Sequence, residues 1–262
     1  MKTSITYYGG KQTMLKYILP NIPKHHIYVE PFLGGGAVFW AKEPCKNEIL
    51  NDTNKEVINF CEVAQNDFKA LNMEIQATLH SRAIHKQARV IYTNPEMFTP
   101  VKRAWAFWTL ANQSFCSDLD AGWKYARNYK IERVQEQKRK RFTKEIQKRL
   151  RRGQLECRDA IQVIKRYDSK RTFFYLDPPY FNADQGHYKG YTIENFTELL
   201  ETLANIKGKF ILSSYPSKVL NKYISKYKWT SFIVEKKITV AKYLTKSKQE
   251  VVTGNYWIFR EK

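Results

Sequence analysis

The chain has 262 residues, enough for one large α/β domain or for one such domain with a smaller insert. Its 45 lysines and arginines outnumber 25 aspartates and glutamates and give a net charge of +20, which favours a polyanionic partner, nucleic acid before an anionic membrane surface. No apolar run reaches about 18 residues and the four cysteines form no CxxC pair, which excludes a transmembrane helix and argues against a zinc site or a disulfide framework.

The first third of the chain predicts two strand-to-helix units. The apolar run 27–29 leads into a glycine-containing loop, and helix-compatible sequence follows from Ala37. A second short strand at Ile49 and Leu50 ends at residues 51–52. Thr53 and Glu56 then have the spacing of a capping box, which predicts that a helix begins there.

The middle of the chain, from about residue 62 to 153, has helical periodicity and no strand pattern, so we interpret it as a helical insert. Thr99 and Pro100 are typical of a helix cap and its first turn. Residues 132–152 contain neither glycine nor proline and are compatible with one continuous helix.

The last third returns to alternating strands and helices. The apolar run 173–176 is typical of a buried parallel strand and stops at a double proline. Thr192 is expected to cap a helix that Gly208 closes, and a further strand follows at 210–212. Residues 235–259 predict a hairpin that adds antiparallel strands at one edge. The fold class is therefore a doubly wound, mostly parallel α/β sheet formed by residues 1–61 and 154–262.

Three motifs follow predicted strands, where the loops of a parallel sheet bind ligands. In the first, successive glycines at 34–36 let the backbone approach a ligand without a Cβ clash. In the second, Asp52 lies 16 residues after Gly36, where a carboxylate can accept hydrogen bonds from ribose hydroxyls. Either motif alone also fits an ordinary turn. Together they predict a site for a nucleoside cofactor.

The third motif is Asp177-Pro178-Pro179-Tyr180, and it is the most specific. The exocyclic amine of a nucleobase is a poor nucleophile because its lone pair is delocalised into the ring. The Asp177 carboxylate and the Pro178 carbonyl can accept hydrogen bonds from that amine and localise the lone pair, and acceptors arranged in advance stabilise the positive charge that develops. The prolines fix the backbone. Tyr180 offers a flat face to an extruded base.

With these motifs in place, the chain resembles the Dam-like, D12 class of DNA adenine-N6 methyltransferases. The order and spacing of the pieces carry the resemblance, which covers residues 5–60 and 155–256. The matching segments are Tyr7-Tyr8-Gly9-Gly10-Lys11, Glu30-Pro31-Phe32-Leu33-Gly34-Gly35-Gly36, Asn51-Asp52, Asp177-Pro178-Pro179-Tyr180 and Glu250-Val251-Val252-Thr253-Gly254-Asn255-Tyr256.

The resemblance implies a fold of the S-adenosylmethionine-dependent methyltransferase type, in which residues 62–153 are a helical insert for target recognition. It implies S-adenosyl-L-methionine as cofactor, S-adenosyl-L-homocysteine as product, and N6 of a flipped-out adenine in duplex DNA as acceptor. Lys11 would lie near the cofactor's carboxylate, Asp52 at its ribose, and the looser match 155–159 near its adenine. The catalytic residues would be Asp177, Pro178, Pro179 and Tyr180. The implied cofactor contacts are Tyr7, Gly9, Gly10, Lys11, Glu30, Pro31, Phe32, Gly34, Gly36, Asp52, Cys157, Arg158 and Asp177.

The middle of the chain departs from that family, because its recognition-hairpin residues are not found between residues 110 and 153. No target sequence is therefore carried over. Residues 124–152 instead contain 13 lysines and arginines against 3 acidic residues, and residues 207–248 contain 11 lysines and a single acid. These regions predict a phosphate-binding surface. Candidate DNA-binding residues are Lys124, Arg127, Lys130, Arg133, Lys138, Arg139, Lys140 and Arg141.

Two alternatives of other classes remain open. One is a methyltransferase acting on RNA or on a protein glutamine, although glutamine enzymes typically have asparagine where Asp177 stands. The other is a catalytically silent DNA-binding regulator, which intact motifs disfavour. We expect double-stranded DNA as partner, no membrane and no metal, and a monomer or weak dimer. The chain shows no apolar secretory segment, so we expect a cytoplasmic enzyme of bacterial or phage origin, with a cognate restriction endonuclease as a further candidate partner.

Overall fold

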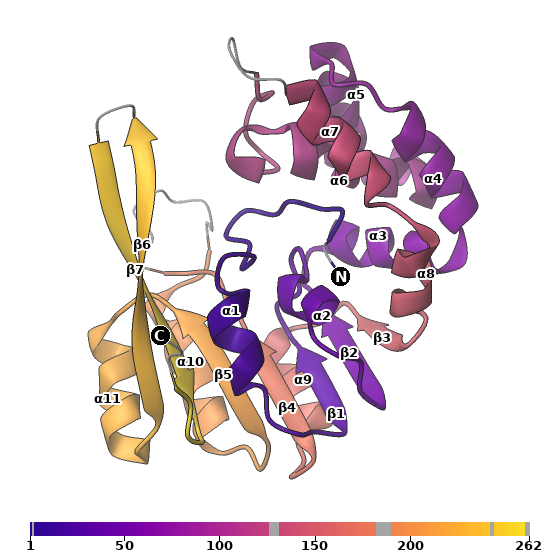
Figure 1. Cartoon of the computed structure of the whole chain (residues 1–262). Coiled ribbons are helices and arrows are strands. Elements are labelled where there is room, and N and C mark those ends of the chain that lie inside the picture. Colours follow the sequence, from indigo (N-terminus) through magenta and orange to yellow (C-terminus); the bar gives the residue numbers. More distant parts are fainter. Residues whose placement is uncertain (2, 126–130, 182–189, 242–243, 260–262) are drawn as a thin grey trace. The chain divides into compact units, whose positions relative to one another are not determined.

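The computed structural model describes residues 1, 3–125, 131–181, 190–241 and 244–259, and it divides the chain into two compact units (Figure 1). The first unit consists of Met1–Gln12, Leu33–Glu43 and Asn47–Arg158. The second consists of Thr13–Phe32, Pro44–Lys46 and Asp159–Lys262. Within the described residues the strands form one seven-stranded sheet with the order β3-β2-β1-β4-β5-β7-β6. This mostly parallel sheet with flanking helices confirms the predicted fold class.

The first unit contains two strands and most of the helices. Its strands β2 and β3 are parallel, and Asn51 pairs with Glu156 at their carboxyl ends. The predicted roles of a catalytic domain and a target-recognition insert concern function and stay a prediction. The elements are α2 (Ala37–Ala41), β2 (Asn47–Asn51), α3 (Lys55–Asn66), α4 (Phe68–Ala77), α5 (Arg82–Thr93), η2 (Pro95–Met97), α6 (Pro100–Gln113), η3 (Phe115–Ser117), α7 (Ile131–Lys140), α8 (Lys144–Leu150) and β3 (Gly153–Glu156).

Helix α6 is the centre of the first unit. Its residues from Ala104 to Gln113 are all buried, and it packs against α3, α4 and α5. The rings of Phe60 and Phe107 lie 5.7 Å apart between α3 and α6, an aromatic contact that adds to the burial of apolar area. The predicted cap is confirmed, since the Thr99 hydroxyl accepts a hydrogen bond from the backbone N–H of Lys102.

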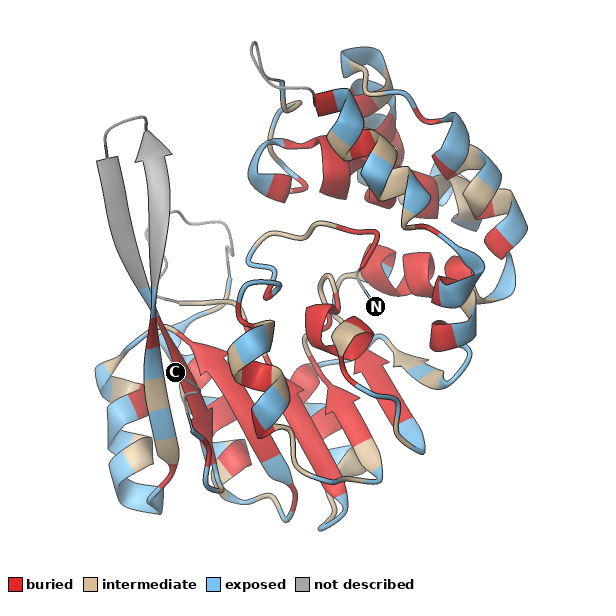
Figure 2. Ribbon diagram, in the orientation of Figure 1, coloured by how far each residue is buried: buried red, intermediate tan, exposed pale blue. Residues whose placement is uncertain are grey.

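The second unit contains the rest of the sheet. Strands β1, β4 and β5 are parallel neighbours in that order, and β7 joins β5 in antiparallel orientation with β6 beyond it. The predicted edge hairpin is thus confirmed. The parallel strands β1, β4 and β5 of this unit are largely buried (Figure 2). The elements are α1 (Leu15–Ile18), η1 (Leu19–Asn21), β1 (Ile27–Glu30), α9 (Ala160–Tyr167), β4 (Thr172–Leu176), α10 (Ile193–Ala204), β5 (Lys209–Ser214), α11 (Lys218–Tyr227), β6 (Thr230–Ala241) and β7 (Leu244–Gly254).

Two predicted helix boundaries are wrong. Helix α3 is capped by Asn54 and not by Thr53, because the Asp52 carboxylate accepts the Asn54 backbone N–H at 2.9 Å and this turn moves the helix start by one residue. Helix α10 ends at Ala204, and Gly208 does not close it. A Cβ at Gly208 would lie 2.8 Å from the carbonyl oxygen of Thr172, so the glycine permits the close approach of two chain segments.

The prediction of one continuous helix over 132–152 is also wrong, because helix α7 ends at Lys140 and a second helix, α8, begins at Lys144. The cause is Phe142, whose buried ring stacks on Phe68 at 5.0 Å. Burying this apolar ring outweighs the helical hydrogen bonds given up around Thr143. Strand β3, which begins at Gly153, was not predicted from the sequence.

Candidate functional site

The glycine loop before α2 is fixed to the carboxyl end of β2. Gly34 and Gly36 have φ of 46° and 61°, left-handed values that side-chain-bearing residues rarely adopt. The backbone N–H of Leu33 donates to the carbonyl of Asn51 at 2.9 Å, and that of Gly34 donates to Asp52 Oδ2 at 2.7 Å. The glycine loop and Asp52, predicted as separate cofactor contacts, therefore form one structure.

Asp52 is a carboxylate held by backbone N–H groups. Its Oδ1 accepts from Asn54 and its Oδ2 from Gly34, which leaves lone pairs on both oxygens for ligand hydroxyls. Burial raises the pKa of Asp52, while these two hydrogen bonds oppose the rise. A partly desolvated carboxylate gains from any further donor, so this group fits the two adjacent hydroxyls of a ribose.

Tyr7 packs on the glycine loop. A Cβ built at Gly34 would lie 3.0 Å from Tyr7 Cδ1, and one at Gly35 would lie 2.9 Å from Tyr7 Cβ, so these positions have no room for side chains. The backbone N–H of Gly10 donates to the Tyr7 carbonyl at 3.0 Å. Lys11 is buried, and its Nζ donates to the Gly9 carbonyl at 2.9 Å. The structure thus joins the N-terminal motif to the glycine loop.

Asn112 of α6 anchors the segment that precedes Tyr7. Its Oδ1 accepts from the Thr6 backbone N–H at 3.2 Å, and its Nδ2 donates to the Ser4 carbonyl at 3.1 Å. The Gln135 side chain of α7 donates to the backbone carbonyl of Asn112 at 2.8 Å. A continuous set of buried hydrogen bonds therefore runs from α7 through α6 to the N-terminal motif.

The loosely matched segment after β3 lies beside Asp52. The Asn51 side chain accepts from the backbone N–H of Arg158 at 2.9 Å and donates to its carbonyl at 3.0 Å. Burial raises the pKa of the Cys157 thiol, and the nearby charge of Asp52 adds to the rise. Arg158 is exposed and pairs with Glu156 at 3.0 Å. Tyr7, Gly34, Asp52 and Cys157 thus belong to one cluster in the first unit.

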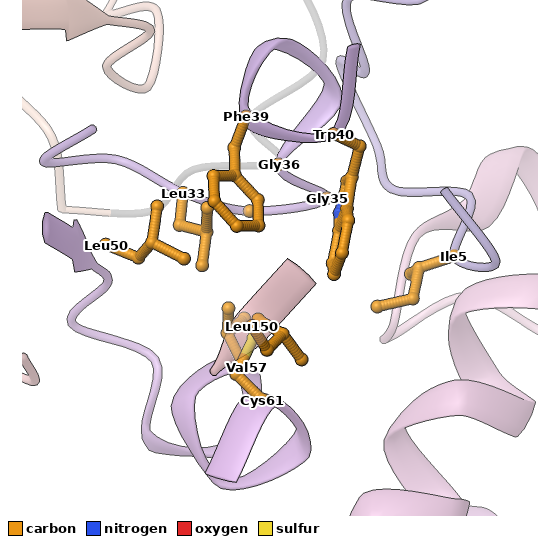
Figure 3. Close-up of a pocket in the computed structure, with 11 residues that line it drawn as sticks. Ile5, Leu33, Gly35, Gly36, Phe39, Trp40, Leu50, Val57, Cys61 and Leu150 are labelled. Carbon is orange, nitrogen blue, oxygen red and sulfur yellow. The ribbon is translucent and has the colours of Figure 1, made fainter. Parts of the chain in front are cut away.

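An apolar pocket lies beneath the glycine loop (Figure 3). Its space is on the order of one water molecule, far below a nucleoside's size. Burial raises the pKa of Cys61 on its wall to about 12, so this thiol is an unreactive packing group. The pocket is a packing space and not a cofactor site. It is lined by Ile5, Leu33, Gly34, Gly35, Gly36, Phe39, Trp40, Leu50, Val57, Cys61 and Leu150.

The second unit holds the double-proline motif at the end of β4. The Tyr180 hydroxyl donates to Asp177 Oδ1 at 3.2 Å and lies 3.4 Å from Glu250 Oε1 on β7. Its ring lies 4.3 Å from the ring of Tyr215, at 55°. Burial, followed by the charges of Asp177 and Glu250, raises the pKa of Tyr180 well above its ordinary value. The phenol therefore stays protonated and acts as a hydrogen-bond donor.

Sequence reasoning assigned no site role to Glu250, Tyr175, Ser213 or Tyr215 in this cluster. The Tyr175 hydroxyl lies 3.2 Å from Ser213 Oγ, and burial raises the pKa of Tyr175, with the charge of Asp177 adding to the rise. A signal for Glu250 was available, because it is an acid at the start of the apolar run 250–252. Of the other predicted contacts in this unit, Glu30 is buried and accepts the Tyr28 hydroxyl at 2.6 Å. Pro31 is buried and Phe32 is half-buried.

Some of the candidate DNA-binding residues bind other groups of the protein, and others present their charge to solvent or to one another. Arg139 Nη1 donates to the Thr78 carbonyl at 2.9 Å, and Lys140 pairs with Glu136 at 2.6 Å. Arg133 is exposed, and Arg127 and Lys130 lie outside the described residues. Burial, then the charges of Arg141 and Lys124, lowers the pKa of Lys138 to about 8. Lys124 and Arg141 thus each repel Lys138, and an anion bound there would relieve this repulsion.

No described helix is long and apolar enough to cross a bilayer. Within the same residues, no group of three or more His, Cys, Asp or Glu side chains is arranged to hold a metal ion.

Comparisons with known proteins converge on one family. Residues 7–253 match the model of the D12 class N6 adenine-specific DNA methyltransferases. A type II methyltransferase of Methanocaldococcus jannaschii, M.MjaIII, is 26% identical over 220 residues, which is 76% of each chain. The DNA N-6-adenine-methyltransferase of Escherichia phage P1 is 38% identical over 63 residues, 24% of this chain and 8% of that protein.

One further relative and one solved structure are also similar to parts or all of the chain. The type II methyltransferase M1.LlaDCHI of Lactococcus lactis subsp. cremoris is 44% identical over 52 residues, 20% of this chain and 18% of that protein. A solved structure of precorrin 8W decarboxylase from Methanobacterium thermoautotrophicum aligns over 97% of both chains at 10% identity. Its TM-score of 0.40 supports no inference.

Proposed function

The chain belongs to the D12 class of N6 adenine-specific DNA methyltransferases, and on this premise we propose that it transfers a methyl group from S-adenosyl-L-methionine to N6 of an adenine in double-stranded DNA. Two relatives carry the name type II methyltransferase, which supports methylation at a specific site. We assign one role to each of the two clusters described above. The cluster around Asp52 would bind the cofactor, and the cluster around Asp177 would bind the base.

The first cluster is proposed to bind the cofactor. S-Adenosylmethionine supplies, when bound, an electrophilic methyl group on its sulfonium. Tyr7, Gly9, Gly10, Lys11 and the loop 34–36 would hold the methionine part, while Glu30, Pro31 and Phe32 of the second unit stay predicted cofactor contacts. Asp52 would accept hydrogen bonds from the ribose hydroxyls, and Cys157 and Arg158 would line the adenine. The half-buried carboxylate with lone pairs on both oxygens and the side-chain-free loop support this assignment.

The second cluster is proposed to bind the base. An adenine extruded from the duplex would place its amine against the Asp177 carboxylate and the Pro178 carbonyl, with its ring against Tyr180. The two acceptors draw the N–H bonds away from the ring plane and localise the lone pair on nitrogen. N6 would become positive as it takes the methyl group, the S–CH3 bond would break to leave S-adenosyl-L-homocysteine, and the Asp177 carboxylate would stabilise the charge on nitrogen until N6 releases a proton to solvent. The rigid Pro178-Pro179 backbone keeps the acceptors in place.

Lys124, Lys138 and Arg141, together with the exposed Arg133 of α7, are proposed to neutralise DNA phosphates. Residues 62–153 would then be the target-recognition insert. Each phosphate neutralised adds about −0.9 to the slope of log affinity against log salt, so binding should weaken steeply with salt. We propose action in the cytoplasm of a bacterium or on phage-infected host DNA, as a monomer or weak dimer. A cognate endonuclease remains a candidate partner.

The observation that carries the proposal is the protonated Tyr180 hydroxyl on Asp177, which keeps a carboxylate oriented directly after a parallel strand. The test is incubation with labelled S-adenosylmethionine and unmethylated DNA, RNA or protein. N6-methyladenine should appear in DNA alone, and Asp177→Ala should abolish it while retaining cofactor binding. Asp67→Ala, an exposed aspartate whose side chain does not cap its helix, should stay active. Label entering RNA or glutamine, or an active Asp177→Ala enzyme, would refute the proposal.

A further inference from the structure

Glu250 is a buried carboxylate beside a predicted catalytic side chain that lies 70 residues away in sequence. It lies on β7, the antiparallel neighbour of β5, and is only 4% exposed. Its Oε1 is 3.4 Å from the Tyr180 hydroxyl, whose other acceptor, Asp177 Oδ1, is at 3.2 Å. A single phenolic oxygen therefore lies within reach of two carboxylates.

The hydroxyl can donate to only one of these carboxylates at a time, because a phenol has one proton. While Tyr180 donates to Asp177, it competes with the substrate amine for the charge of that carboxylate. If the hydroxyl turns to Glu250, its hydrogen bond no longer competes with the amine for the charge of Asp177. The O–H rotor needs no movement of the ring, which Tyr215 contacts at 4.3 Å.

We propose that Glu250 is a positioning residue of the methyl transfer, the alternative acceptor that takes the Tyr180 hydroxyl when the adenine amine binds Asp177. This role rests on the proposed function of Asp177 and Tyr180. In this role Glu250 acts on the reaction through the phenol of Tyr180. No bond forms or breaks in this step, in which one hydrogen bond is exchanged for another.

The test is a double-mutant cycle of Glu250→Gln and Tyr180→Phe, with methyl transfer to unmethylated plasmid DNA as readout. Glutamine keeps the size of the side chain but is a weaker acceptor, and phenylalanine keeps the ring without its hydroxyl. We expect Glu250→Gln to lower kcat about tenfold, the magnitude of a hydrogen bond to a charged group, without changing the Kd for S-adenosylmethionine. Glu235→Gln, an exposed change of equal charge on the neighbouring strand β6, is the matched control and should be unaffected.

The decisive result is whether the effect of Glu250→Gln on kcat depends on the presence of the Tyr180 hydroxyl. In Tyr180→Phe, the additional change Glu250→Gln should have no further effect on kcat, because the hydroxyl through which it acts is gone. Equal losses in both backgrounds, or a Glu250→Gln enzyme as fast as wild type, would overturn the assignment. Should Tyr180→Phe transfer too slowly to measure, the same cycle is read in the Kd for unmethylated DNA, where the amine meets Asp177 and additive effects of the two changes would overturn the assignment. Wild-type protein that fails to methylate DNA would instead refute the proposed function.

Discussion

We predict that Asp52→Asn weakens cofactor binding strongly but changes the stability of the fold little. The change keeps the size of the side chain, but one carboxylate oxygen becomes an amide NH2. One of the backbone N–H groups of Gly34 and Asn54, which now donate at 2.7 and 2.9 Å, then faces a donor. A ribose that binds through both oxygens also loses an acceptor.

The expected magnitude follows from these contacts. Each lost hydrogen bond to a charged group is worth about 1.5–3 kcal/mol, so the Kd for S-adenosylmethionine should rise about ten- to hundredfold. Stability should respond less, because burial raises the pKa of Asp52 and the neutral amide escapes that desolvation. We expect the two effects on the folded state to offset one another to within about 1 kcal/mol, a shift in Tm of about 4 °C at most.

Calorimetric titration with S-adenosylmethionine and thermal unfolding without it measure the two quantities. Asp67→Asn at the far end of α3, an exposed aspartate that makes no side-chain cap, is the control and should change neither. The raised pKa of Asp52 adds a pH dependence, since ribose hydroxyls favour the ionised carboxylate. Affinity of the wild type should therefore rise with pH until the raised pKa of Asp52 in the folded protein is passed, and that of Asp52→Asn should not. Unchanged affinity in the variant would show that Asp52 does not hold the ribose.

Three further predictions concern other parts of the first unit. Burial lowers the pKa of Lys138 to about 8, and a phosphate would raise it, so DNA affinity should fall as pH rises through 8, with proton uptake on binding. Lys138→Gln should remove both effects in calorimetry in two buffers. Burial would raise the pKa of Glu48, but hydrogen bonds from Arg149 and Lys42 hold that pKa below 4.5. The ionised Glu48 therefore stabilises the fold above pH 4.5, and this stabilisation is lost as the pH falls through the lowered pKa. Glu48→Gln should lower the free energy of unfolding by about 3–5 kcal/mol in denaturant titrations, because two buried cations lose their partner; a loss under 1 kcal/mol would contradict this. Asn112→Ala should weaken S-adenosylmethionine binding without weakening DNA binding, and equal losses in both assays would indicate general unfolding.

The sequence predicted elements whose signals are local. Strand β4 is an apolar run ended by two prolines, and the caps Thr99 and Thr192 each act within three residues. Asp52 was expected at the end of a strand, where it is found. Such features need no knowledge of distant parts of the chain, because the residues that form them are neighbours in sequence.

What the sequence did not predict depends on partners far along the chain. The break after α7 arises from Phe142 stacking on Phe68, and no glycine or proline marks it. The run of cations near residue 140 does not reveal that Arg139 is engaged with the Thr78 carbonyl. Charge patterns give the sign of a surface, but which cations are available to a ligand is decided by tertiary contacts.

The two clusters also differ in how the fold holds them. Asp52 is held by the N–H groups of Gly34 and Asn54, both within 18 residues, and backbone donors of this kind survive most side-chain changes. Tyr180, in contrast, has a carboxylate on β7 as a neighbour, and β7 is held through its antiparallel pairing with β5 and β6. The edge hairpin therefore does more than extend the sheet, because it brings Glu250 to the phenol. Changes that loosen the hairpin should thus impair methyl transfer before they impair cofactor binding, since no backbone donor that holds Asp52 belongs to it.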